Sequence, residues 1–586
     1  MRLVETRLLE GPNVYRLEPV VKLEVAIGRR RTWYGQRDPG RHALVHLGRD
    51  VPAADWPDPV AATVAWIRRL RVDHGEGRSG LAVHRSSDPG HWIVTFPWLG
   101  AERALTLTEA ALALAERDVS PSRTAQLTGA QERLLARWTE RLATARATPP
   151  EWLRDADRRV PIVSISGTNG KSTVTRLISH ILLRAGRHVG TTTSDGVLVD
   201  ERMIEPGDWT GPAGAQQVLT RRDIDVAVLE TARGGMVLRG VGYESNDASV
   251  LTNVSSDHLD LQGIHTLPEL AEVKSTICRI TRPDGWVVLN ADDPLVAAVA
   301  RRVKANVALF TLDGDSAVVR RHLHRGGRAY LVRDGVIVES NGEVETPIVE
   351  VARVPITIGG LARHNVANAL AAVGGARGVG ATIAQVADGL TNFAPSAESS
   401  PGRLNLFRLG SKVVIVDFAH NEAGIGAVLD VAQGIASGAA GRAAPITVII
   451  GTAGDRPDDT LRGIGRIAAE RAQRVAIKET LTYLRGRTAE SVVGELMVGV
   501  VAGGMSAANV PIYETETEAL QAELDGAAGT GANGGRSDAA RVVVLMCHED
   551  RAGVFELLRR LGARPVDVAS ELTELVPRIQ ARPRED

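Results

Sequence analysis

Residues 160–186 read VPIVSISGTNGKSTVTRLISHILLRAG and decide the fold of the chain. PIVSIS is a short apolar strand, GTNGKST is a glycine-rich turn, and TRLISHILLRAG has the apolar spacing of a helix. This order forms a cradle for phosphate, because glycines let backbone N–H groups face the anion and the helix N-terminus adds partial positive charge. The turn supplies seven candidate nucleotide-binding residues: Gly167, Thr168, Asn169, Gly170, Lys171, Ser172 and Thr173.

Two side chains of this turn have chemistry that suits a nucleoside triphosphate. Lys171 can neutralise the β- and γ-phosphate oxygens, and the Ser172 hydroxyl can ligate magnesium. The spacing departs from G-x-x-x-x-G-K-[ST], because position 165 is Ile. A purely structural glycine turn is the alternative, which the Gly-Lys-Ser-Thr order between a strand and a helix disfavours.

The sequence around this turn alternates between strands and helices. Apolar strands are predicted over 225–230, 248–254, 285–290 and 306–312, with helical patterns between them. This alternation predicts a mostly parallel sheet that is covered on both faces. The stretch 320–358 has shorter strands, and we interpret it as a β-rich insertion.

Two further units flank this region. Strands such as KVVIVDFAH, PITVIIG, RVAIK and RVVVLMC predict a second α/β domain that begins near residue 399. Alternating runs at 42–48 and 91–96, with amphipathic helices over 59–71, 103–117 and about 122–147, predict a small α+β domain. The predicted domains are residues 1–158, 159–398 and 399–586.

Composition excludes several classes of protein. The 586 residues carry 69 Lys and Arg against 70 Asp and Glu, so no global basic field favours nucleic acid or an anionic membrane. Two cysteines cannot form a disulfide framework, and a reducing compartment fits them. The N-terminal residues have no continuous apolar segment, and no run of 18 apolar residues occurs. We therefore expect a cytoplasmic protein with neither a nucleic-acid nor a membrane partner.

Charged residues follow two of the predicted strands. Glu230 ends one strand, and Asp257 and His258 follow the next one. Ligands of open α/β sheets lie at these carboxyl ends, and magnesium prefers oxygen ligands. A surface glutamate or a structural histidine is the alternative for each alone, but their shared place beside a phosphate loop favours a site. Lys274 lies on the following helix, and an exposed helix lysine is its ordinary interpretation.

Taken together, the motifs resemble the Mur ligase superfamily, which includes folylpolyglutamate synthase, and most closely the C-terminal half of the cyanophycin synthetases. The strings that carry the resemblance are GTNGKST (167–173), TTTSDG (191–196), TGP (210–212), LETARGG (229–235), DHL (257–259), LNADDPL (289–295), HNVANALAA (364–372), PGRLNLF (401–407), DFAHNEAG (417–424) and RGR (485–487). The segment LLEGPNVYRLE resembles the start of those synthetases more weakly. The resemblance implies a P-loop Mur-ligase central domain and a Rossmann-like C-terminal domain behind the small α+β domain.

The resemblance also implies roles for individual residues. Ser172 and Glu230 would bind one Mg²⁺, His258 would bind a second, and Lys274 matches a lysine that many Mur ligases carbamylate into a metal ligand. Asn365 and Asn368 would lie on the adenine side of ATP, and Arg403 and Asp417 would contact the nucleotide from the third domain. The implied substrate-binding residues are Thr192, Thr193, Asp195, Arg233, His420, Arg485 and Arg487.

The implied reaction is ATP-dependent amide bond formation. A substrate carboxylate attacks the γ-phosphate to form an acyl phosphate, and an amine such as an amino acid then displaces phosphate. Lys171, Glu230, His258 and Lys274 would be the catalytic residues. Two anions must approach each other in the first step, so a lysine and magnesium ions are needed to screen their repulsion.

Two departures from the cyanophycin synthetases leave alternatives open. Those enzymes have an ATP-grasp domain between the N-terminal and Mur-like regions, for which about ten residues leave no room here, so a separate ATP-grasp protein is a candidate partner. Their acidic residues after Lys478-Glu479 are replaced by Thr, Leu and Tyr, which weakens arginine as the amine, although an acidic loop at 455–459 could compensate. The alternative function is a catalytically altered ATP-binding protein that works with or regulates such a partner. A simple P-loop ATPase or kinase is disfavoured by the motifs at 401–407 and 417–424, and homo-oligomerisation stays open.

Overall fold

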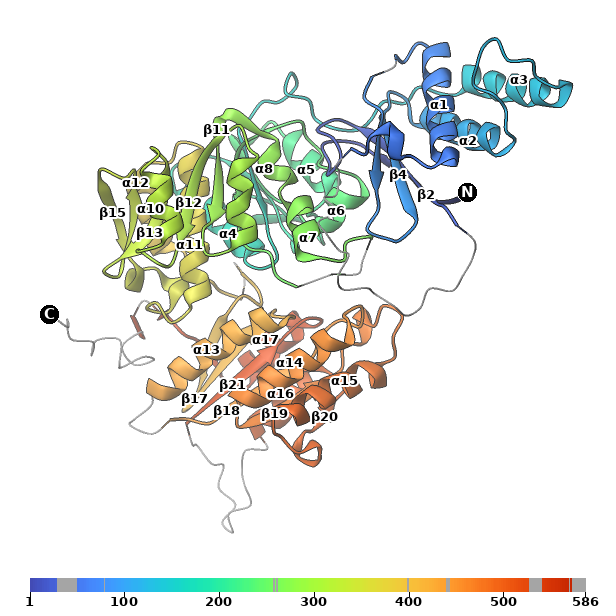
Figure 1. Cartoon of the computed structure of the whole chain (residues 1–586). Helices are drawn as coiled ribbons and strands as arrows, with labels where there is room; N and C mark the ends of the chain where they lie inside the picture. The colour runs from blue at the N-terminus through green and yellow to red at the C-terminus, as the bar shows by residue number, and fades with distance from the viewer. Residues whose placement is uncertain are drawn as a thin grey trace.

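The computed structural model describes residues 1–28, 50–77, 79–256, 259, 262–397, 400–438, 443–525, 540–568 and 570–571 (Figure 1). These residues form three sheets of four, eleven and seven strands. The α/β class, with a small α+β unit before two larger units, is confirmed. The predicted strand at 42–48 and most of the glycine-rich stretch 525–540 lie outside the described residues. The exact domain boundaries stay predictions.

The N-terminal unit is an antiparallel sheet covered by helices. Its strands are β1 (Arg2–Leu9), β2 (Val20–Ala26), β3 (Ala82–Arg85) and β4 (His91–Pro97), in the order β1-β2-β4-β3. Helices α1 (Asp58–Asp73) and α2 (Ala101–Glu116) bury one core with the sheet, as predicted. Helix α3 (Gly129–Thr144) is shorter than its prediction and begins at a capping box on Thr128.

The middle sheet places the phosphate loop at its centre. Strand β5 (Ile162–Ser166) pairs in parallel with β9 (Val226–Glu230) on one side and β10 (Asn246–Leu251) on the other. The carboxyl ends of β9 and β10 therefore flank the turn that follows β5. The remaining strands are β6 (Val189–Thr192), β7 (Gly196–Val199), β8 (Arg202–Pro206), β11 (Thr281–Asn290), β12 (Asn306–Thr311), β13 (Arg328–Arg333), β14 (Val336–Ser340) and β15 (Glu345–Glu350).

The interpretation of 320–358 as an insertion is wrong. Strand β13 pairs in parallel with β12, and β14 and β15 extend the same sheet in antiparallel fashion. These strands form one edge of the eleven-stranded sheet. Their short alternating pattern reflects an edge that is covered less completely than the centre.

Helices cover both faces of the middle sheet. On one face α4 (Lys171–Arg184), α11 (Arg363–Gly378) and α12 (Ile383–Asn392) share a core with β5, β9 and β10. The other face is covered by α5 (Pro212–Leu219), α7 (Leu267–Lys274), α8 (Thr276–Arg279) and α9 (Pro294–Ala297). Helix α11 approaches closely, because a Cβ on Gly374 or Gly375 would lie 2.5 Å from Val288 or Ile178.

The C-terminal unit is a second, mostly parallel sheet. Its order is β20-β19-β18-β21-β17-β16-β22. The strands are β16 (Asn405–Leu409), β17 (Lys412–Asp417), β18 (Ile446–Ile450), β19 (Arg474–Lys478), β20 (Ile512–Tyr513), β21 (Arg541–Met546) and β22 (Arg564–Pro565). The covering helices are α13 (Glu422–Gly438), α14 (Asp458–Arg471), α15 (Ala489–Ala502), α16 (Glu516–Asp525) and α17 (Arg551–Arg560). The predicted strands of this domain are all present.

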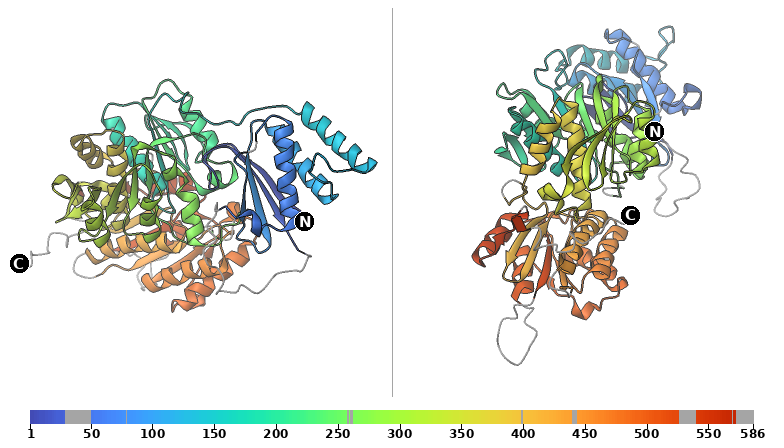
Figure 2. Two further views of the ribbon diagram at one scale, coloured as in Figure 1. Left: turned by 45° about the horizontal axis from the view of Figure 1, so that its top comes forward. Right: turned by 90° about the vertical axis from the view of Figure 1, so that its left-hand side faces the viewer.

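The N-terminal and C-terminal units contact different parts of the middle unit (Figures 1 and 2). No helix in the described parts of the chain combines the length and apolar character that a membrane span requires.

The N-terminal unit docks on the middle unit through backbone contacts: Val241 N–H donates to Pro12 O at 2.7 Å, and Glu10 N–H donates to Arg239 O at 2.8 Å. A Cβ on Gly11 would lie 1.8 Å from Val241 O, so this contact requires glycine.

Replacing Gly11 with Ala is expected to lower the free energy of unfolding by about 1–3 kcal/mol, because the added methyl group collides with a backbone carbonyl that cannot rotate away. Gly129→Ala is the matched control, since its nearest contact would be 3.5 Å from the flexible end of Arg133. Denaturant unfolding compares the two. Equal stability of both variants would contradict the tight docking.

Candidate active site

The phosphate loop between β5 and α4 has no room for side chains at two positions. Gly167 (φ 149°) and Gly170 (φ 85°) adopt conformations that disfavour other residues. A Cβ on Gly167 would lie 1.9 Å from Thr252 Oγ1, and one on Gly170 would lie 2.2 Å from Asn368 Oδ1. The loop is therefore held between the end of β10 and helix α11.

Hydrogen bonds from the segment after β10 hold the middle of the loop. Asn253 Oδ1 accepts from Asn169 N–H at 2.9 Å, and Asn253 Nδ2 donates to Asn169 O at 3.0 Å. Thr252 Oγ1 donates to the same carbonyl at 2.7 Å. The sequence did not predict that Thr252 and Asn253 support the loop. The only signal for this role was their position at the end of a predicted strand.

Two ammonium groups bind loop carbonyls. Lys171 Nζ donates to Thr168 O at 3.0 Å, and the buried Lys274 Nζ donates to Gly167 O at 2.6 Å. Lys274 is therefore buried, and the ordinary interpretation of this residue as an exposed helix lysine is wrong. Both cations therefore lie against the backbone of the phosphate loop.

Glu230 ends β9 as a buried carboxylate that is only 3% exposed. Its Oε2 atom is buried and has no hydrogen-bond partner among the residues that the structure describes. Burial raises the pKa of this carboxyl group, and nearby Lys171 and Ser172 only partly offset that increase. An unpartnered buried carboxylate oxygen beside the Ser172 hydroxyl fits the oxygen donor set that Mg²⁺ prefers.

The C-terminal domain reaches the phosphate loop directly. An Arg403 Nη2 atom lies 3.4 Å from Ser172 Oγ, and Asn421 Nδ2 donates to Asn169 Oδ1 at 3.0 Å. Asp417 accepts from Leu404 N–H at 2.7 Å, so it fixes the turn that carries Arg403. The structure therefore brings the predicted Arg403 and the loop together.

Asp417 is half-buried, and desolvation raises the pKa of its carboxyl group, although Arg403 and backbone N–H donors counteract this. Asn365 and Asn368 lie in the first turns of α11, where Asn368 Nδ2 donates to Asn365 Oδ1 at 3.0 Å. Asn365 Nδ2 donates in turn to Ile356 O at 2.9 Å. Asn368 lies against Gly170, so the pair is next to the phosphate loop.

The predicted substrate-binding residues of the TTTSDG motif make contacts within the protein. Thr192 Oγ1 lies 3.5 Å from Glu230 O, and Thr193 Oγ1 accepts from Asp195 N–H at 3.1 Å. Asp195 is buried between Arg176 and Arg551. Arg233 begins helix α6 (Arg233–Leu238), three residues after Glu230.

The remaining predicted residues lie at the carboxyl edge of the C-terminal sheet or outside the described chain. Arg485 pairs with Asp455, and Arg487 Nη1 lies 2.6 Å from Asp458 Oδ1. The acidic loop thus neutralises these arginines. His420 Nδ1 lies 2.9 Å from Phe418 O. The predicted metal ligand His258 and its neighbour Asp257 fall outside the described residues.

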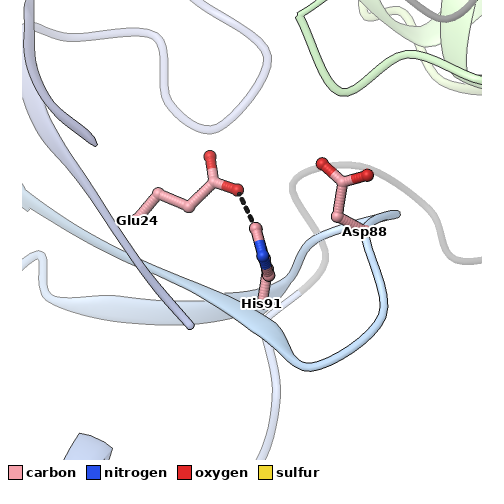
Figure 3. Close-up of side chains that lie close together, drawn as sticks. All are labelled: Glu24, Asp88 and His91. Atoms are coloured by element: carbon pink, nitrogen blue, oxygen red, sulfur yellow. Dashed lines mark hydrogen bonds and ion pairs between the residues drawn. The ribbon is translucent and has the colours of Figure 1, made fainter. Parts of the chain in front are cut away.

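A polar cluster in the N-terminal unit also has ligand-type side chains. Figure 3 shows Glu24 bonded to His91, with Asp88 on the far side of the ring. The second Glu24 oxygen lies 2.9 Å from Lys22 Nζ, and Asp88 lies 3.1 Å from His265 Nε2 of the middle domain. Lys22 and His265 thus already pair with the two carboxylates of the cluster, which is the ordinary arrangement of a hydrogen-bonded ion-pair network.

Glu230→Gln is expected to stabilise the ligand-free protein by about 1 kcal/mol at pH 7.5. Because folding raises the pKa of Glu230, the free energy of unfolding falls as pH rises from the usual value of 4.5 through the raised pKa. A neutral amide at this position does not ionise and so avoids this loss of stability. The gain should shrink as pH falls toward the usual value of 4.5. Thermal unfolding at several pH values tests this, with the exposed Glu343→Gln as the control. No gain at pH 7.5 would contradict the account.

Comparison with known proteins agrees with this geometry. Residues 165–376 match the Mur ligase middle domain, and residues 402–548 match the Mur ligase glutamate ligase domain. The cyanophycin synthetases of Crocosphaera subtropica and Synechocystis sp. are each 40% identical, over 380 and 367 residues. These matches cover 64% and 63% of this chain, but only 42% and 41% of those synthetases.

A more distant relative shares part of the same region. The UDP-N-acetylmuramoylalanine–D-glutamate ligase of Symbiobacterium thermophilum is 35% identical over 236 residues, which are 40% of this chain and 45% of that enzyme. The chain thus spans less than half the length of each relative it matches here. The phosphate loop and Glu230 lie in the first matched domain, and Arg403 and Asp417 lie in the second. The chain therefore carries the middle and glutamate ligase domains of the Mur ligase family.

Proposed function

We propose that this protein is an ATP-dependent ligase that joins a substrate carboxylate to an amine. ATP is converted to ADP and phosphate through an acyl-phosphate intermediate. The observation that carries the proposal is the closed arrangement in which Arg403 of one domain faces Ser172 and the buried Glu230 of the other. The relatives support it, since their names describe a cyanophycin synthetase and a D-glutamate ligase.

The carboxylate and the γ-phosphate are both anions, so the first step needs positive charge between them. Lys171 can turn from Thr168 O to the phosphates, and Arg403 can donate from the opposite domain. Magnesium would be held by Ser172 and Glu230 and would supply further charge neutralisation. His258 is a proposed ligand of a second ion, and Lys274 could serve as one only after carbamylation converts its ammonium into a carboxylate-like group. The adenine side would be formed by Asn365 and Asn368.

The second step needs a dry site, because an acyl phosphate hydrolyses if water reaches it. The contacts of Asn421 and Arg403 with the phosphate loop close the C-terminal domain over the middle domain. The amine would enter at the carboxyl edge of the C-terminal sheet, as ligands of such sheets do. His420, Arg485 and Arg487 lie at this edge as proposed substrate-binding residues, and the two arginines could hold the carboxylate of an amino-acid donor.

The acceptor would approach from the side of the N-terminal unit. Only small pockets lie along this boundary: one of about 20 Å³ lined by residues that include Lys22, Glu24 and Met236, and one of about 10 Å³ lined by residues that include Met236 and Glu230. Both are too small for a substrate in this arrangement, so the proposed approach rests on the place of the N-terminal unit beside the middle domain.

The relatives say less about the substrates than about the type of reaction, because the chain spans less than half the length of the cyanophycin synthetases. A separate ATP-grasp protein that supplies the acceptor is the proposed partner. The pairs Asp455–Arg485 and Asp458–Arg487 leave little uncompensated negative charge for a guanidinium, so a donor other than arginine fits better. The alternative of a ligase that has lost turnover is not favoured, because the relatives are ligases and the proposed nucleotide-binding residues Lys171, Ser172 and Arg403 lie close together.

We expect phosphate release that depends on both an acceptor carboxylate and an amine. Purified protein, ATP and Mg²⁺ are incubated with amino acids and aspartate-rich peptides, and products are identified by mass. Lys171→Ala should reduce turnover at least 100-fold, because the phosphates lose their lysine. The surface variant Lys304→Ala is the control. A condensed product formed equally well by Lys171→Ala would show that the active site lies elsewhere.

A further inference from the structure

Arg551 lies where the C-terminal domain meets the middle domain, although it belongs to none of the motifs above. It is the first residue of α17, and its side chain is 28% exposed. Arg551 Nη1 donates to Asp195 Oδ1 at 2.8 Å and to Pro401 O at 3.1 Å. The guanidinium therefore joins a middle-domain carboxylate to the turn that precedes Arg403.

The acceptor of this contact is held firmly in the middle domain. Asp195 is 7% exposed at its side chain, and Arg176 from α4 donates to its other oxygen at 3.0 Å. Burial alone would raise the pKa of this carboxyl group, but Arg403, Arg551 and Arg176 together lower it. Asp195 is thus ionised at neutral pH and has both oxygens bound by arginines. This occupation argues against a direct role for Asp195 in substrate binding.

Arg551 also packs against the residues around Arg403. The side chain touches the turn at Gly402, where a Cβ would lie 3.0 Å from Arg551 Cδ. The guanidinium groups of Arg403 and Arg551 lie 4.8 Å and 5.7 Å from the centre of the Phe418 ring. Phe418 therefore orients both arginines, as cations over an aromatic ring. A change at Arg551 would release one side of the Arg403 turn.

The backbone that carries Arg551 is anchored by a buried ion pair. Glu516 accepts from Asp550 N–H at 2.8 Å and from Glu549 N–H at 3.0 Å, directly before Arg551. Lys478 Nζ lies 2.6 Å from Glu516 Oε1, and both side chains are almost fully buried. Burial alone would raise the pKa of Glu516, yet Lys478 and the backbone donors lower it to about 2. The start of α17 is therefore a rigid base for the arginine.

We propose that Arg551 is a positioning residue that locks the two domains together. Its guanidinium ties the Pro401–Arg403 turn to Asp195, and so holds Arg403 against the phosphate loop. The interaction acts on closure and on the orientation of Arg403, and Arg551 itself does not touch the reacting groups. The kinetic consequence rests on the proposed ligase function, whereas the effect on domain closure does not.

Arg551→Ala is expected to lower kcat at least tenfold, because Arg403 loses its support and closure is less complete. Asp195→Asn should lower kcat by a similar factor. The double variant should have a kcat no lower than that of the less active single variant, because both substitutions remove the same interaction. Arg551→Lys should recover part of the activity through its charge. Arg559→Ala is the control, as it lies on the same helix in a surface pair with Glu556.

Domain closure is measured without catalysis, by spin labels on Ile204→Cys and Val498→Cys in the full chain. Both positions are about half exposed, at 51% and 52%, and lie in different domains. The native Cys278 and Cys547 are buried, so they will not compete for the label. We expect a narrow distance distribution that becomes longer and broader with Arg551→Ala and stays unchanged with Arg559→Ala.

The two measurements separate the possible failures. An unchanged distance distribution in a folded Arg551→Ala protein would overturn the positioning role, whatever the activity. A broadened distribution in a protein that ligates no substrate would support the interdomain contact and count against the proposed function. Strictly additive kinetic effects of Asp195→Asn and Arg551→Ala would show that the residues do not act as a pair. Circular dichroism confirms that each variant is folded.

Discussion

The backbone of the phosphate loop lies so close to its neighbours that two of its residues have no room for a side chain. Thr252 closes one side at Gly167, and Asn368 closes the other at Gly170. The loop can therefore exist only when β10 and α11 have reached their final positions. The central place of β5 in its sheet satisfies this requirement, because it puts β9 and β10 on either side and leaves one face for α11.

The same arrangement concentrates charge in a molecule that has almost none in total. A net charge of -1 conceals a site where Lys171, Arg403, Arg176 and Arg551 surround two buried carboxylates. Both oxygens of Asp195 are bound by arginines, whereas one oxygen of Glu230 has no partner within the described parts of the chain. The first carboxylate contributes to holding the domains together, and the second is available for a cation. Burial is similar for the two groups, so the difference lies in their neighbours.

The fold could be predicted from the sequence to a considerable extent. The strand, turn and helix over 160–186 identified the phosphate loop, and Glu230 was found because it ends an apolar strand. Sequence reasoning was wrong about 320–358, since a short edge strand has no local mark that distinguishes it from an insertion. Arg551 was missed for a different reason. It lies 356 residues from Asp195 in the chain, so only the assembled domains bring the two together.

Helix α11 has a consequence for how the protein acquires its nucleotide site. Gly374 and Gly375 allow close packing, but each glycine costs about 1 kcal/mol of helix stability relative to alanine. The helix is consequently stable mainly through its contacts with the sheet. Its first turns carry Asn365 and Asn368, so the proposed adenine side of the site would form only once the sheet is complete. The affinity for ATP would then depend on the whole folded domain. Bound ATP would in turn stabilise the domain against unfolding, including parts that lie far from the nucleotide.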